Sequence, residues 1–159
     1  MTVNPAIVQA EPFSMRVNGL AAPQGSKTLT RWGGMKEASA NVMPWREAIK
    51  AAVQTQYNGI MMSGPVEVSV EFIFQRPKGH YKTKNGVVSE QLKDWAPIHC
   101  ESSRHGDIDK LCRSTLDGLA AKSGGQLIAD DSQVVMLTAR KRYANVQEPA
   151  GAMIAVKPL

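Results

Sequence analysis

Residues 106–119 read GDIDKLCRSTLDGL, and this stretch determines the fold more than any other in the sequence. It has the spacing of one helix face, with a stripe formed by Ile108, Leu111, Cys112, Thr115, Leu116 and Leu119. We predict a helix over residues 107–122, ended by Gly124-Gly125. Its apolar stripe must pack against another element to leave water.

The flanking sequence supplies candidates for that element. A helix is predicted over 44–57, with Pro44 in its first turn, Trp45 in the core and Asn58-Gly59 at its end. Strands are predicted over 13–20, 65–75, 133–143 and 151–156, and the second of these alternates most regularly. The order β-α-β-α-β-β predicts an α/β or α+β domain with a mixed sheet and two main helices.

Three segments lack such periodicity. Residues 1–12 are expected to form a flexible N-terminal tail, which leaves 13–159 as the single folded domain. Residues 19–34 are rich in Gly, Pro and Ser and predict a loop. Residues 77–105 are polar and look irregular, and a loop of that length is usually functional or mobile.

The composition restricts the class of protein. The chain has 159 residues, 43% of them hydrophobic, which suits one domain with a real core. Its net charge of +5 and pI near 9.4 fit either a polyanionic partner or a mildly basic soluble protein. No signal-peptide pattern and no apolar run of about 18 residues is present, so we expect a cytoplasmic protein without membrane contact.

Three acids suggest a metal site. Asp107 falls at the N-cap of the predicted helix, Asp109 lies in its first turn, and Asp131 follows a short apolar segment. Carboxylates are the ligands that Mg²⁺ prefers, and Lys110 or Arg113 could stabilise negative charge beside it. The same residues also fit an ordinary helix cap, surface ion pairs and a turn before a strand.

The motifs around these acids resemble a known family. GDIDKLCR at 106–113, LDGL at 116–119 and IADDSQV at 128–134 are similar to the motifs of RusA-type Holliday junction resolvases. The loop from Gly19 to Lys27 resembles the entry loop of that family, and the resemblance covers roughly residues 13–157. It implies a homodimeric endonuclease of phage or bacterial origin that cuts four-way DNA junctions in recombination and repair.

The resemblance also implies residue roles. It places the metal ligands for Mg²⁺, for which Mn²⁺ may substitute, at Asp107, Asp109 and Asp131, and implies no small-molecule cofactor. The family's Lys falls on Arg113 and its Asn on Lys110, so this chain departs from the pattern at both positions. Arg keeps the charge but not the shape of Lys, which puts turnover and junction preference in doubt more than the metal site.

DNA contacts are expected from Lys27, Arg31, Arg104 and Lys141, with Arg104 and Lys27 favoured because they fall beside the motifs, while each of these residues also fits an ordinary solvated surface charge. Trp32, Tyr81 and Trp95 are candidates for stacking on unpaired bases. A zinc site from His99, Cys100, His105 and Cys112 is disfavoured because the spacing matches no usual ligand pattern. Two other functions stay open: a branched-DNA binding module with weak or lost cleavage, and a nuclease that prefers flaps or forks.

Overall fold

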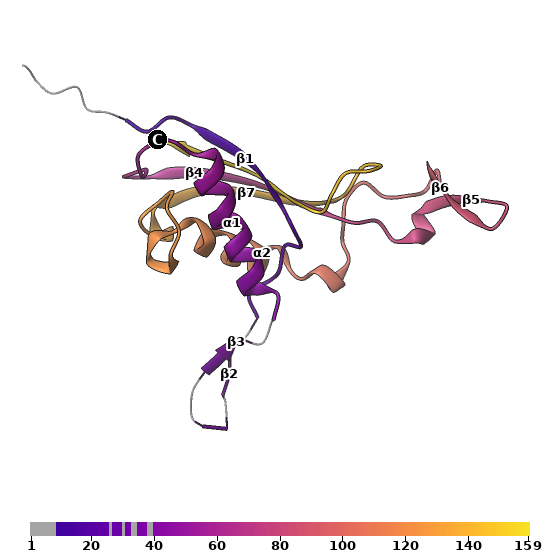
Figure 1. The fold of residues 1–159 in the computed structure, drawn as a ribbon, viewed down its shortest axis with the longest axis horizontal. Coiled ribbons are helices and arrows are strands. Elements are labelled where there is room, and N and C mark those ends of the chain that lie inside the picture. The colour runs from indigo at the N-terminus through magenta and orange to yellow at the C-terminus, as the bar shows by residue number, and fades with distance from the viewer. Residues whose placement is uncertain (1–8, 26, 30, 33–34, 38–39) are drawn as a thin grey trace, which may run out of the picture.

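The computed structural model describes residues 9–25, 27–29, 31–32, 35–37 and 40–159, with only the backbone described for 27–29 and 35–37. Its centre is a mixed sheet of four strands in the order β1-β8-β4-β7 (Figure 1). These strands are β1 Phe13–Asn18, β4 Val66–Phe74, β7 Val134–Tyr143 and β8 Gly151–Pro158. β4 pairs in parallel with β7 and antiparallel with β8, which confirms the predicted α+β fold with a mixed sheet.

The two faces of the sheet differ because β4 alternates. Val66, Val68, Val70 and Phe72 are buried in the same core as the helices, whereas Ser69 on the opposite face is exposed. The helices are α1 Val42–Gln56 and α2 Ile108–Leu119, and they contact one another as well as β1 and β7. Both helices therefore cover one face of the sheet, as the apolar stripes require.

A buried polar contact links the helices. The Nε1–H of Trp45 donates to Oγ1 of Thr115 over 3.1 Å, and Thr115 donates to the Leu111 carbonyl over 2.8 Å. Beside it, the partly buried Arg46 and Asp117 form an ion pair between the helices at 2.8 Å. Trp45 is thus a core residue, as predicted, and its polar atom is satisfied across the α1–α2 contact.

The helix ends differ from the sequence prediction. α1 begins at Val42 rather than Pro44, which still leaves the proline in the first turn, where no backbone donor is needed. α2 ends at Leu119 rather than Lys122, because Ala120 is extended and the N–H groups of Leu127 and Ile128 donate to the Leu119 carbonyl. This pairing with a later segment replaces the last helical turn, and Ala121–Ser123 forms the short 3-10 helix η3 instead.

The prediction that 77–105 is irregular is wrong. The segment contains a hairpin of β5 Tyr81–Lys84 and β6 Val87–Leu92, preceded by the 3-10 turn η1 Lys78–His80 and followed by η2 Ser103–His105. Asn85 and Gly86 join the strands with φ values of 53° and 76°. Asn-Gly favours this left-handed turn, which outweighs the polar composition of the strands.

A short strand, β2 Lys27–Leu29, lies within the segment where a loop was expected, and it pairs antiparallel with β3 Met35–Glu37, which follows that segment. Among the described residues, no helix is both long and apolar enough to cross a membrane. The first eight residues of the predicted tail lie outside the described residues, and β1 begins at Phe13, where the folded domain was predicted to start.

Candidate active site

A hollow of about 510 Å³ opens between α2 and β7. Its polar wall contains Asp109, Arg113 and Asp131, and the rest of its lining is Ile108, Cys112, Leu116, Leu137 and Ala139. The side chains of Asp109 and Arg113 share one face of α2 because four residues separate them. The structure therefore brings together two of the three predicted metal ligands and Arg113, one of the two candidate cations.

Asp131 is positioned by a turn with its own hydrogen bonds. It opens the 3-10 helix η4 Asp131–Gln133, which leads directly into β7. Asp130 caps this helix by accepting from the Ser132 N–H over 2.8 Å, while the side-chain oxygen of Gln133 accepts from the Asp130 N–H over 3.1 Å. Gln133 also donates to the carbonyl of Met62 over 3.0 Å, so the turn is tied to the chain entering β4.

Asp107 lies outside this hollow. It is the N-cap of α2, as predicted, with an extended backbone, but its side chain makes no capping hydrogen bond. Its carboxylate is exposed and accepts from Lys110 Nζ over 3.3 Å. Within the described part of the chain, no group of three or more His, Cys, Asp or Glu side chains is placed to hold one metal ion.

Lys122 is a site residue that the sequence reasoning missed. Its ammonium donates to Asp131 and also to Asp130, the latter over 3.3 Å. The hydrogen bond to Asp131 raises the pKa of Lys122. Lys122 belongs to no recognised motif and lies nine residues from Asp131 in the sequence, so only the turn at η3 reveals the contact.

Cys112 also lines the hollow, and its chemistry bears on the zinc alternative. Burial raises the pKa of this thiol to about 11, and the neighbouring Asp109 carboxylate adds to the effect. Without a bound metal the thiol therefore stays protonated at neutral pH and is a poor nucleophile, whereas a coordinated zinc ion would itself deprotonate a thiol. The hollow offers the carboxylates of Asp109 and Asp131 as oxygen donors, and such donors suit a hard ion.

Gly106 fixes how the chain enters α2. It has a φ of 90°, and a Cβ there would lie 2.4 Å from Cγ of Pro23. Lys141 donates to the Gly106 carbonyl over 3.0 Å, and Gln24 N–H donates to the Lys110 carbonyl over 3.1 Å. The loop before β2 is therefore packed against the start of α2, next to Asp107.

The predicted DNA-binding residues have different surroundings. Arg31 and Arg104 are exposed, and Arg104 lies in η2 just before the site. Lys141 is partly buried, and its ammonium donates a hydrogen bond to the Gly106 carbonyl. The side chain of Lys27 lies outside the described part of the chain. The neighbouring Arg142 is bound in ion pairs with Glu71 and Glu148.

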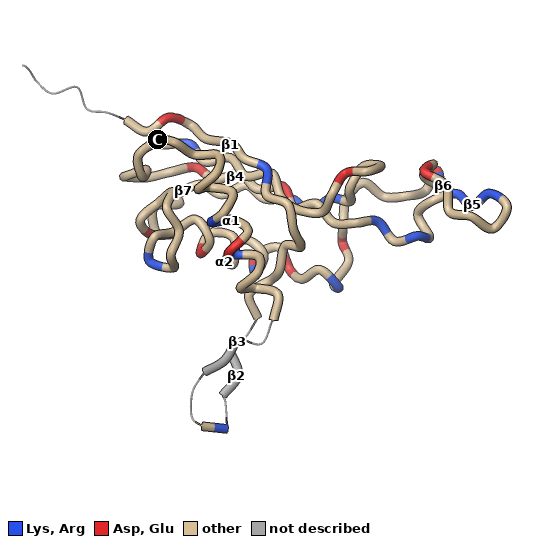
Figure 2. Tube along the Cα trace, viewed as in Figure 1, with Lys and Arg blue, Asp and Glu red and all other residues tan. Residues whose placement is uncertain are grey.

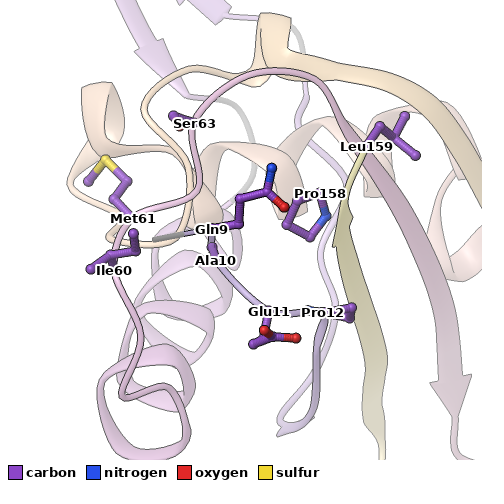
Figure 3. Close-up of a pocket in the computed structure, with 9 residues that line it drawn as sticks. All are labelled: Gln9, Ala10, Glu11, Pro12, Ile60, Met61, Ser63, Pro158 and Leu159. Carbon is purple, nitrogen blue, oxygen red and sulfur yellow. The ribbon is translucent and has the colours of Figure 1, made fainter. Parts of the chain in front are cut away.

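A second hollow, of about 380 Å³, lies at the far end of β8 (Figure 3). The segment preceding β1, the connection from α1 to β4 and the C-terminal residues line it: Gln9, Ala10, Glu11, Pro12, Ile60, Met61, Ser63, Pro158 and Leu159. Among the described residues of this lining, the one ionisable side chain is the carboxylate of Glu11, and none is a Lys or Arg that could bind a polyanion as Arg113 could in the hollow beside α2.

Comparison with known proteins agrees with these motifs. A family model described as Endodeoxyribonuclease RusA matches residues 19–157. A search of curated proteins finds no match.

Proposed function

Because the chain belongs to the RusA family of endodeoxyribonucleases, we propose that it resolves four-way DNA junctions by paired symmetric cuts in a Mg²⁺-dependent reaction. The observation that carries this proposal is the shared hollow of Asp109, Arg113 and Asp131. The reaction would serve DNA recombination and repair in the cytoplasm of a bacterium or a phage-infected cell.

Asp109 and Asp131 would hold the metal ion, with Asp107 as the third carboxylate. Bound Mg²⁺ would supply Lewis acidity toward the phosphodiester and lower the pKa of a water molecule. The carboxylate oxygens of Asp109 and Asp131 support this choice of ion, because Mg²⁺ prefers oxygen ligands. Lys110 and Lys122 neutralise Asp107 and Asp131 in this structure, so each ammonium competes with a cation for its carboxylate.

Arg113 would stabilise negative charge on the phosphate rather than transfer a proton. A guanidinium does not give up its proton in proteins, so an arginine cannot serve as a general base. From its position on the wall of the hollow it would bind the phosphate and stabilise the extra negative charge of the transition state. Lys110, which is bound to Asp107, would contribute only if that ion pair opened.

A homodimer would supply the two cuts. A four-way junction has two-fold symmetry, and the proposed site in each chain cuts one strand. Two copies related by a two-fold axis would match the two equivalent strands of the substrate.

The test is cleavage of an end-labelled synthetic four-way junction with Mg²⁺ or chelator. We expect paired symmetric nicks that require Mg²⁺ and that Asp109→Asn reduces by about 100-fold or more, because the variant removes a charge from the reaction centre. Asp131→Asn and Asp107→Asn should act similarly and retain junction binding. The control is Glu47→Gln, which also replaces a carboxylate with an amide but does so at an exposed side chain of α1. Undiminished cutting by Asp109→Asn would refute the assignment of the site.

A branched-DNA binding module is the second candidate function. The ion pairs of Lys110 with Asp107 and Lys122 with Asp131 favour it, because they oppose metal binding. It predicts tight junction binding without cutting in Mg²⁺ or Mn²⁺. If cutting is weak, Lys110→Asn combined with Arg113→Lys should raise it, and competition with flaps and forks tests the substrate preference.

A further inference from the structure

Residues 76–98 form an arm that extends beyond the end of β4 and away from the helices (Figure 1). The arm contains η1, β5 and β6, and its returning chain leads through residues 99–106 into Asp107. β5 and β6 have four and six residues. At about 3.3 Å per residue such strands are roughly 13–20 Å long, a large part of a DNA helical turn of about 34 Å.

The base of the arm is fixed to the sheet. Arg76 donates to the carbonyl of Ala144 over 2.9 Å and to that of Pro97 over 2.7 Å, and it lies over the Tyr143 ring. His80 packs edge-on against Tyr143, with ring centroids 4.9 Å apart. The hairpin is therefore held at a defined place next to the chain that enters the active site.

The arm carries much of the excess charge. Its five Lys and Arg residues exceed its two acids, Glu90 and Asp94, by three, out of a net charge of +5 for the chain. Figure 2 shows the basic residues spread along the arm. Lys78, Lys82 and Lys84 are exposed, and the ion pair recorded for this group joins Lys82 to the fully exposed Asp94 at 3.8 Å.

Large apolar side chains are exposed between these lysines. Val87 and Val88 follow the Asn85-Gly86 turn at the tip, with 68% and 44% of their surface exposed. Trp95 is 64% exposed, and Lys93 lies above its ring at 5.5 Å. Exposed lysines mixed with apolar surface suit a DNA backbone, in which charged phosphates alternate with sugars.

We propose that this arm binds the backbone of a duplex arm of the branched substrate, outside the strand exchange point. The inference rests on the proposed junction-cutting function and adds a contact that none of the motif residues supplies. A second copy of the chain fits the arm less well, because lysine is depleted in protein interfaces whereas phosphate contacts depend on it.

The test compares Lys82→Gln/Lys84→Gln with the control Lys50→Gln/Lys157→Gln, which removes equal charge from α1 and β8. Junction binding is measured with chelator, so that cutting plays no part, from about 50 to 200 mM salt. The arm variant should lower the slope of log affinity against log salt by up to about 1.8 and weaken binding roughly tenfold or more. Cutting by saturating enzyme should stay close to parental.

Three results would overturn the inference. Equal losses in both variants would assign the effect to net charge, and parental binding by the arm variant would exclude the contact. A change in oligomeric state confined to the arm variant would assign the arm to contact between copies. If the parental chain binds and cuts junctions, these results refute only the arm contact; if it does neither, the proposed function fails as well.

Discussion

Replacing Thr115 with valine should destabilise the protein by removing one acceptor from its core. Thr115 and Trp45 are 0% and 1% exposed, so water cannot replace the hydrogen bond to the indole N–H. Valine has nearly the same shape as threonine, and the Leu111 carbonyl keeps its helical hydrogen bond. The cost is therefore that of a buried donor without a partner, about 1–3 kcal/mol.

That cost is measurable by urea or thermal unfolding followed by circular dichroism. For a chain of this length, 1 kcal/mol corresponds to about 2–4 °C in the midpoint, so Thr115→Val should melt roughly 3–10 °C lower. Trp45→Phe removes the donor, and in that background Thr115→Val should cost about 1 kcal/mol less.

The double-mutant cycle provides the decisive comparison. Additive effects, with a coupling energy below about 0.5 kcal/mol, would show that the indole hydrogen bond does not join α1 to α2. A parental melting temperature for Thr115→Val would refute the reasoning outright. A coupled pair would identify this contact as one that holds α2, which carries part of the proposed site, against the core.

Three further predictions concern the site and its support. Lys122→Gln should lower the Mg²⁺ concentration for half-maximal cutting several-fold, because it frees the carboxylate of Asp131; a loss of rate at saturating metal would instead give the ammonium a direct role. The hydrogen bond from the Arg142 guanidinium lowers the pKa of Glu148 to about 2. The contribution of Glu148 to folding stability is therefore present above about pH 4.5 and is lost as the pH falls toward 2. Glu148→Gln should therefore cost about 1–2 kcal/mol at pH 7, after allowance for solvent screening, and the difference from the parental protein in urea melts should vanish near pH 2. Gly106→Ala should cost about 2–4 kcal/mol and slow cutting, because its φ of 90° is strained for alanine and the added Cβ overlaps Pro23; an unfolding midpoint within error of the parental one would contradict this.

The local patterns that the sequence predicted correctly involve residues close together in the chain. The stripe on 108–119 identified α2, and the alternation in 65–75 identified β4, because helix and strand periodicities are set by backbone geometry. The four-residue spacing of Asp109 and Arg113 placed both on the wall of one hollow for the same reason. The Asn85-Gly86 turn was also readable locally, although the polar strands beside it obscured the signal.

By itself, the sequence determined the α+β class, the two main helices, the family motifs and the placement of Asp109 and Arg113 on one helix face. Only the tertiary structure decided that α2 ends at Leu119, that Lys122 binds Asp131, and that Asp107 faces Lys110 outside the hollow. The hydrophobic periodicity of a helix or strand depends only on residues within one turn or one pleat, so the sequence alone reveals it. The partner of an ammonium or the end of a helix depends on which distant segment packs beside it, and that is settled only when the whole core forms.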